Sequence, residues 1–302
     1  MATLYTQADK NVRRTYFLIG IFLIFVIALG WLFSYILENS IILYFAVAFS
    51  VITSVGSYWY SDRIVLKMTR AKPIEKSDNP ELYRLVENLC IAAGLPLPKI
   101  YILSEAQPNA FATGRNAEHA VVAVTTGLLN RLERAELEGV IAHELSHIGN
   151  KDMLLQTIAV VLAGIIALVS HWFLRITFFG GGRRDSNKSG GGALILVLGL
   201  IAAILAPIGA SMIKMAISRK REFLADAEAA LLTRYPEGLA LALEKISQDS
   251  SPMRRANNST AHLFLISPFK GKQNKSWLTK LFMTHPSTEE RIKKLRGMQI
   301  KN

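Results

Sequence analysis

The sequence predicts a mainly α integral membrane protein with four hydrophobic helices and a cytoplasmic α+β domain that contains a small sheet. Hydrophobic residues make up 51% of the 302-residue chain, a high share for a soluble domain. They are concentrated in four stretches of about 20 residues without Asp, Glu, Lys or Arg, each long enough to cross a bilayer as a helix. The segments outside these stretches contain short apolar strands and capped helices, which indicates a water-exposed α+β unit.

The four apolar stretches are residues 16–37, 41–61, 153–174 and 193–213. The first is interpreted as an uncleaved anchor, because its apolar core is longer than the roughly 7–15 residues of a signal peptide and no small-x-small cleavage site follows it. Only Glu38, Asn39 and Ser40 separate the first two stretches, so these are expected to form a hairpin with a tight turn.

Basic residues indicate the orientation of this hairpin. Lys10, Arg13 and Arg14 precede it, the tight turn has no basic residue, and five basic residues follow it: Arg63, Lys67, Arg70, Lys72 and Lys76. The positive-inside rule therefore places the N-terminus and residues 62–152 in the cytoplasm. Anchoring to anionic headgroups accounts for the formal charge of +12, and no nucleic acid partner is expected.

Residues 62–152 are expected to form the first part of the cytoplasmic domain. Asn79 caps a helix that begins at Pro80 and stops near Gly94. A further helix begins at Ala135. Between the two helices the pattern predicts three strands, at residues 99–103, 110–113 and 119–124, with a turn at 114–118.

The chain is expected to divide into four parts: an N-terminal transmembrane hairpin (1–61), a first cytoplasmic part (62–152), a second hydrophobic hairpin (153–217) and a second cytoplasmic part (218–302). The connector inside the second hairpin is rich in glycine and basic residues, so whether this hairpin crosses the bilayer completely stays open. In both cases the chain after residue 217 returns to the side of the first cytoplasmic part.

The segment His143-Glu144-Leu145-Ser146-His147 lies within the helix that begins at Ala135. Positions i and i+4 of a helix share a face, so the two imidazoles can bind one zinc ion. Glu144 faces the same ion without being needed as a ligand, which suits a base that activates water. The spacing therefore predicts part of a zinc-peptidase site.

Two histidines leave a catalytic zinc one protein ligand short. Glu222 and Asp226 are again i and i+4, and they directly follow the second hydrophobic hairpin, which would return Glu222 to His143 at the membrane surface. Glu222 is then the expected third ligand, and Asp226 would orient a ligand histidine or a nearby arginine. The alternative is that Glu222 is a solvated partner of Arg219 or Arg221.

Four segments follow one another in an order found in a known family: Pro108–Gly114, His143–His147, Ser218–Asp226 and Thr284–Ser287. In these segments the chain resembles the HtpX-type membrane zinc metalloproteases, which are related to the CAAX prenyl-protease metalloenzymes. The resemblance covers nearly the whole chain and implies a zincin-like (gluzincin) catalytic domain that binds one zinc ion. It implies zinc ligands at His143, His147 and Glu222, with Glu144 as the catalytic base.

The resemblance also implies a way of binding substrate. An edge strand would hold the substrate in extended form through backbone hydrogen bonds, which read little sequence. This strand is expected at Asn109 to Gly114, with Asn109, Ala110, Phe111 and Ala112 as the residues that bind substrate. His285, which precedes Pro286 and a helix predicted to run from Ser287 through Ile292, would donate a hydrogen bond to the tetrahedral oxyanion. Its spacing alone does not indicate catalysis, so a capping or packing role is the alternative.

The function that the resemblance implies is proteolytic quality control of misfolded or damaged membrane proteins under stress, at the cytoplasmic face of a bacterial inner (plasma) membrane. The expected partners are the lipid bilayer and membrane-protein or unfolded polypeptide substrates, and the oligomeric state is not indicated. One alternative is a protease that processes a narrow, for example lipidated, substrate. Another is a membrane scaffold or transporter without enzymatic activity, although the apolar stretches contain no row of ionisable residues that would mark an ion path.

Overall fold

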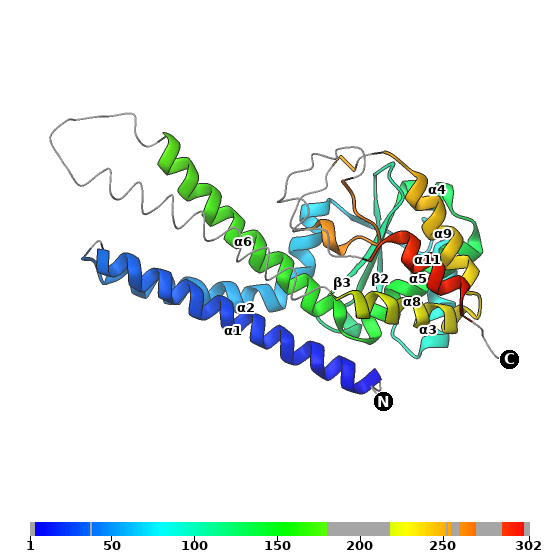
Figure 1. The fold of residues 1–302 in the computed structure, drawn as a ribbon, viewed down its shortest axis with the longest axis horizontal. Helices are drawn as coiled ribbons and strands as arrows, with labels where there is room; N and C mark the ends of the chain where they lie inside the picture. Colours follow the sequence, from blue (N-terminus) through cyan, green and yellow to red (C-terminus); the bar gives the residue numbers. More distant parts are fainter. Residues whose placement is uncertain are drawn as a thin grey trace.

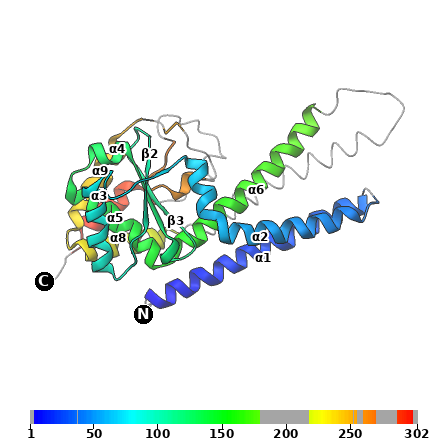
Figure 2. The same ribbon diagram turned by 180° about the vertical axis from the view of Figure 1, so that it is seen from behind.

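The computed structural model of the protein consists of a globular α+β domain and a set of long helices that project from one side of it (Figure 1). The view from behind shows the same arrangement, with the long helices leaving the domain together (Figure 2). The residues that the structure describes are 4–36, 38–179, 218–251, 253–254, 260–269 and 286–298.

The long helices are α1 (Leu4–Ile36), α2 (Ile41–Thr69) and α6 (Asp152–Phe179). Among the described residues, three stretches are long and apolar enough to cross a membrane: Ala8–Tyr35, Ile41–Thr69 and Asp152–His171. The first three predicted spans are therefore confirmed as long apolar helices, and α2 continues past the predicted end at residue 61. The fourth predicted span, residues 193–213, lies outside the described residues.

One stripe of α1 attaches this helix to α6. Asn11, Thr15, Leu18 and Phe22 follow one another at helical spacing, and each is 1% exposed or less. Leu18 and Phe22 pack in one apolar cluster with residues of α6 such as Leu155. Many large apolar side chains elsewhere on α1 and α2 are exposed, as expected of helices whose other faces contact lipid.

The sheet has four strands in the order β1-β2-β4-β3: β1 (Lys72–Pro73), β2 (Lys99–Leu103), β3 (Ala110–Thr113) and β4 (Val121–Thr125). β2 and β4 are parallel, whereas β1 pairs with β2 and β3 pairs with β4 in antiparallel fashion. β3 is thus at an edge of the sheet, although all four of its residues are buried.

Two details of the sheet differ from the sequence-based prediction. The strand expected at residues 119–124 starts at Val121, because Ala117–His119 form a 3₁₀ turn (η1) that the Asn116 side chain caps. The two-residue strand β1 was not predicted, since so short a strand shows no alternation of apolar and polar residues.

The helices of the domain are α3 (Pro80–Ala93), α4 (Thr126–Arg131), α5 (Arg134–Gly149), α8 (Arg219–Thr233), α9 (Pro236–Gln248) and α11 (Thr288–Arg296), and Ala261–Leu263 form a second 3₁₀ turn, η2. The predicted bounds of α3 are confirmed. Asn79 accepts a hydrogen bond from the Leu82 backbone N–H at 3.0 Å, and Gly94 ends the helix with a φ of 65°.

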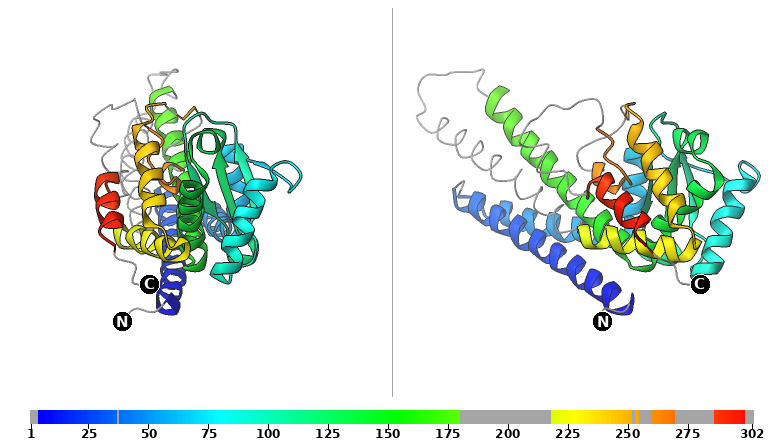
Figure 3. Two further views of the ribbon diagram at one scale, coloured as in Figure 1. Left: turned by 90° about the vertical axis from the view of Figure 1, so that its right-hand side faces the viewer. Right: turned by 45° about the vertical axis from the view of Figure 1, so that its right-hand side comes forward.

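α5 is the central helix of the domain and contacts α3, β3, α8 and α9 (Figure 3). Its close approach to α9 depends on Gly139, because a Cβ atom there would lie 2.7 Å from the backbone nitrogen of Leu239. Val140, Ile141 and Leu145 of α5 belong to the main apolar core. Other elements surround α5 on several sides. The polar side chains that lie between these apolar residues in the sequence of α5 are therefore buried as well.

Candidate metal centre

Five polar side chains of α5 are buried, and three of them belong to the predicted motif: His143, Glu144 and His147 are 1%, 2% and 6% exposed. The two histidines are one helical turn apart, and their Nε2 atoms lie 3.2 Å from each other. The Nδ1 atom of each ring lies beside a carboxylate of another residue. This arrangement satisfies one nitrogen of each buried ring and leaves the two Nε2 atoms directed toward a common point.

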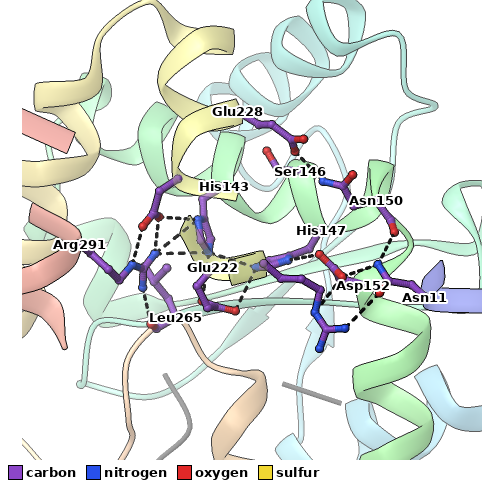
Figure 4. Close-up of polar contacts among 12 residues, drawn as sticks. Asn11, His143, Ser146, His147, Asn150, Asp152, Glu222, Glu228, Leu265 and Arg291 are labelled. Atoms are coloured by element: carbon purple, nitrogen blue, oxygen red, sulfur yellow. Dashed lines mark hydrogen bonds and ion pairs between the residues drawn. The ribbon is translucent and has the colours of Figure 1, made fainter. Parts of the chain in front are cut away.

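The third predicted ligand comes from α8. Glu222 is 1% exposed, with Oε2 3.9 Å from His143 Nε2 and Oε1 3.8 Å from His147 Nε2. Figure 4 shows the three side chains facing one another. The structure thus brings Glu222 back to the two histidines, and the alternative of a solvated Glu222 does not fit its burial.

The His143, His147 and Glu222 side chains form a group that could hold a metal ion. Ligands of a tetrahedral zinc ion at about 2.1 Å lie about 3.4 Å apart. In this structure one ligand atom from each of the three residues lies within 4.8 Å of the other two. Two imidazole nitrogens and one carboxylate are the donor set of His₂Glu zinc peptidases, in which one coordination position is open to water or substrate.

His143 is held by Asp226, which lies one turn after Glu222 on α8. Asp226 Oδ1 is 3.0 Å from His143 Nδ1, and Arg291 of α11 donates hydrogen bonds to both Asp226 oxygens, at 2.7 and 2.9 Å. Burial alone would raise the pKa of Asp226, but Arg291 and the hydrogen bond with His143 outweigh it and lower the pKa to about 2. Burial lowers the pKa of His143 to about 4.

His147 has an equivalent partner in Asp152, the first residue of α6. α5 ends at Gly149, and α6 begins at Asp152 after a turn in which Lys151 has a φ of 55°. Asp152 Oδ2 then lies 3.2 Å from His147 Nδ1. Burial disfavours the charged ring, but the hydrogen bond to Asp152 and the negative charge of Glu222 outweigh it and raise the pKa of His147 to about 9.

The other oxygen of Asp152 is held by two residues from distant parts of the chain. Asn11 of α1 donates to Asp152 Oδ1 at 2.6 Å, and Arg221 Nε lies 3.2 Å from the same oxygen. Asn11 also donates to the Asn150 carbonyl at 2.9 Å and accepts a hydrogen bond from Arg221 at 3.1 Å. Figure 4 shows this continuous chain of contacts from Asn11 to His147.

Sequence reasoning missed Arg291, Asp152 and Asn11. Arg291 lies in the helix that was predicted to follow His285, but no pattern connected it to Asp226. Asp152 was treated as the boundary between a cytoplasmic part and a membrane hairpin. Asn11 and Asp152 are 141 residues apart, so their contact leaves no local signal in the sequence.

Glu144 lies between the candidate ligands and β3. The backbone N–H of Ala112 donates a hydrogen bond to its carboxyl group. Burial raises the pKa of Glu144 to about 7, in spite of the lowering influence of His147. A carboxyl group that titrates near neutral pH is suited to accept a proton in one step of a reaction and to release it in another.

The edge of β3 that does not pair with β4 is partly covered by another segment of the same chain. The Leu265 N–H donates to the Ala110 carbonyl at 3.0 Å, and the Leu265 carbonyl accepts from Arg291 Nη1 at 3.2 Å. Asn109 binds the next residue with both ends of its amide, donating to the Ile266 carbonyl at 2.8 Å and accepting from its N–H at 3.3 Å. The chain therefore already holds two residues of its own backbone against the predicted substrate strand.

The remaining predicted site residues have different outcomes. Phe111 directs its side chain into the core, where it is fully buried and packs edge-to-face against Phe264 with ring centroids 5.3 Å apart. His285 lies outside the described residues. The helix expected after it is present as α11, and the Ser287 side chain caps this helix by accepting a hydrogen bond from the Glu290 N–H at 3.2 Å.

The model of peptidase family M48 matches residues 76–299 of the chain. This range includes α5, α8 and α11 with their site residues. The chain belongs to peptidase family M48. It is accordingly a metalloprotease, and its apolar helices make it a membrane-bound one. The family implies a metal ion, generally zinc, for which His143, His147 and Glu222 form a possible binding group.

Curated relatives of this M48 protease extend the match to the N-terminal helices. A protease HtpX homolog from Caldanaerobacter subterraneus subsp. tengcongensis is 45% identical over 301 residues, which cover 99% of each chain. Another from Syntrophobacter fumaroxidans is 49% identical over 256 residues, 84% of this chain and 88% of that protein. The HtpX-type resemblance inferred from the four motif segments is confirmed.

One solved structure shares the fold. The crystal structure of S. mikatae Ste24p matches with a TM-score of 0.50 and 19% identity, over 97% of this chain. The M48 protease described here covers 66% of the Ste24p chain. The likeness supports the arrangement of a small mixed sheet with long apolar helices, and at this level of identity it shows the fold alone.

Proposed function

We propose that this M48 protease is a zinc-dependent endopeptidase that cleaves misfolded or damaged membrane proteins at the cytoplasmic face of a bacterial inner membrane, as quality control under stress. One observation carries the proposal above all. Asp152, which begins an apolar helix long enough to span a membrane, also contacts the candidate ligand His147. The candidate metal centre is therefore at the end of the membrane helices, where segments of membrane proteins that leave the bilayer are within reach.

The buried residues of the centre have complementary roles in the proposed reaction. Zinc held by His143, His147 and Glu222 would supply Lewis-acid chemistry, which lowers the pKa of water to roughly 7 and polarises the scissile carbonyl. Glu144 would take a proton from the attacking water and return it to the leaving amine, a task that its raised pKa of about 7 supports. Asp226 and Asp152 would keep both imidazoles oriented with Nε2 toward the centre.

The bonds of Leu265 and Ile266 support the proposal that β3 binds extended polypeptide. These two residues are held only through their own backbone N–H and C=O groups. Their partners are the Ala110 carbonyl and the side chains of Asn109 and Arg291. A substrate would take the same bonds after the Leu265–Ile266 segment moves aside, and its scissile bond would lie near Ala112, where Glu144 is held. Recognition of this kind reads extended shape rather than sequence, which suits unfolded substrates.

Three further predictions remain part of the proposal. His285 would donate a hydrogen bond to the oxyanion from the segment before α11. The cytoplasmic position of the centre is supported by the basic residues that flank the N-terminal hairpin. The division into two hydrophobic hairpins and two cytoplasmic parts follows from the same pattern, and the two cytoplasmic parts would meet at the centre, because α5 and α8 lie in contact.

Full-length protein reconstituted into liposomes with zinc is expected to cleave a destabilised membrane protein at least about tenfold faster than the same protein in its folded form, because cleavage needs a locally unfolded segment. A chelator should abolish cleavage, and added zinc should restore it. Fragments are measured on gels, and mass spectrometry identifies the cleavage sites. Equal cleavage rates on the folded and destabilised forms would contradict a quality-control role. Cleavage at a single site in one dedicated substrate would favour a processing protease. Cleavage that persists without metal would exclude the zinc mechanism.

A further inference from the structure

We propose that Asn11, on the N-terminal membrane helix α1, is a positioning residue of the metal centre: it holds Asp152 in place and thereby sets the orientation of His147. The inference rests on the proposed zinc site and goes beyond it, because it assigns α1 a role in the centre in addition to anchoring. Residue 11 also lies outside the segment that matches the M48 family model, residues 76–299.

Both polar atoms of the Asn11 amide are hydrogen-bonded. It is 1% exposed, its Nδ2 donates to the Asp152 carboxylate and to the Asn150 carbonyl, and its Oδ1 accepts from Arg221. A buried amide costs free energy unless its hydrogen bonds are made. Here the partners lie in the turn after α5, at the start of α6 and at the start of α8. Asn11 thus connects α1 to both helices that supply the candidate ligands.

The two carboxylate oxygens of Asp152 contact different residues. Oδ2 contacts His147 Nδ1 at 3.2 Å, whereas Oδ1 is held by Asn11 at 2.6 Å and by Arg221 at 3.2 Å. Because the carboxylate is planar, a contact that fixes Oδ1 also fixes the direction of Oδ2. Loss of Asn11 would leave Oδ1 with the longer of the two contacts and release the carboxylate to turn away from His147.

His143 provides an internal comparison. Its carboxylate partner Asp226 is held by two hydrogen bonds from one arginine, Arg291, at 2.7 and 2.9 Å. That support comes from α11 inside the domain and involves no residue of α1. A change at Asn11 is therefore expected to disturb one side of the centre only, at His147.

The test replaces Asn11 with leucine, which has a similar volume and makes no hydrogen bonds, in the full-length protein. Asn11→Leu is expected to release zinc to a chromophoric chelator roughly 3- to 10-fold faster than the wild type, because the partners of a metal-bound histidine contribute to metal affinity. The visible spectrum of the Co²⁺-loaded protein should change, since it reports the ligand geometry. In peptide hydrolysis kcat should fall while KM stays close to the wild-type value.

Thr15→Val is the matched control. Thr15 lies one turn further on the same buried stripe of α1 and is also 1% exposed. Within the described part of the chain, its hydroxyl bonds only to the Asn11 carbonyl of its own helix, at 2.9 Å. This variant should leave the zinc release rate and the Co²⁺ spectrum unchanged. An equal effect of both substitutions would mean that α1 acts through general packing and would overturn the proposed role of Asn11.

A second pair of variants covers the case in which Asn11→Leu does not fold. Asn11→Asp sets two carboxylates against each other and should also speed zinc release, whereas the exchange Asn11→Asp with Asp152→Asn restores a donor–acceptor pair and should recover part of the loss. Wild-type zinc retention in both Asn11→Leu and Asn11→Asp would overturn the inference. A wild-type protein that binds no zinc would instead overturn the proposed function, so the two failures are distinguishable.

Discussion

Glu144→Gln is expected to lower kcat for peptide hydrolysis by about 10²- to 10⁴-fold, the usual contribution of a general acid–base group. Glutamine has nearly the same size as glutamate, and its side-chain oxygen can still accept the hydrogen bond from the Ala112 backbone. It cannot take a proton from water or return one to the leaving amine. The substitution therefore removes the proposed proton transfer and keeps the packing of the site.

The measurement is the initial rate of cleavage of an unfolded polypeptide by the zinc-loaded full-length protein. Glu138→Gln is the matched control, because Glu138 is a partly exposed glutamate on the same helix and pairs with the exposed Arg134 at 3.1 Å. The control should cleave at the wild-type rate, and both variants should hold as much zinc as the wild type. Cleavage by Glu144→Gln within a few-fold of the wild-type rate would show that another group acts as the base.

Glu222→Ala is expected to weaken zinc affinity by more than about 100-fold. This exceeds the loss of affinity that follows when a residue that only hydrogen-bonds a metal ligand is removed. Two imidazoles alone would remain, and the buried site would lose the negative charge that offsets the cation. The zinc content of the purified protein, and zinc affinity in competition with a chelator, measure the effect.

Glu244→Ala serves as the control for this variant, because Glu244 is a glutamate of α9 that pairs with Arg296 at 2.9 Å, away from the candidate ligands. Thermal unfolding of Glu222→Ala should resemble that of the metal-free wild type, which would show that the fold is intact. Full zinc occupancy in folded Glu222→Ala would mean that a different residue is the third ligand.

The sequence was most informative where the relevant spacing is short. His143 and His147, and likewise Glu222 and Asp226, are i and i+4 pairs, so the side of the helix that each pair occupies follows from helical geometry alone. That the two pairs meet followed from counting the membrane crossings between them. The Pro80 helix and the strand at Ala110 were predictable for a related reason, because caps, breakers and strand-forming residues are local patterns. The position of this strand at an edge of the sheet was implied by the family resemblance.

The residues that hold the carboxylate partners of the two histidines were not predictable in this way. Arg291 reaches Asp226 across 65 residues, and Asn11 reaches Asp152 across 141. Polar and basic residues at the ends of apolar stretches are ordinarily interpreted as interfacial anchors, so Asn11 and Arg221 carried no signal for a buried contact. The pairing of Leu265 with Ala110 depends on how the chain returns to the sheet after α9, and no local pattern indicates this path.

X-ray absorption at the zinc edge of the wild-type protein tests the central claim most directly, because it reports the atoms bound to the metal. A centre formed by His143, His147 and Glu222 predicts one tightly bound zinc ion per chain with only nitrogen and oxygen neighbours at about 2.0–2.2 Å and the multiple-scattering signature of two imidazoles. A sulfur neighbour at about 2.3 Å, or a spectrum without imidazole scattering, would contradict the assignment of this site.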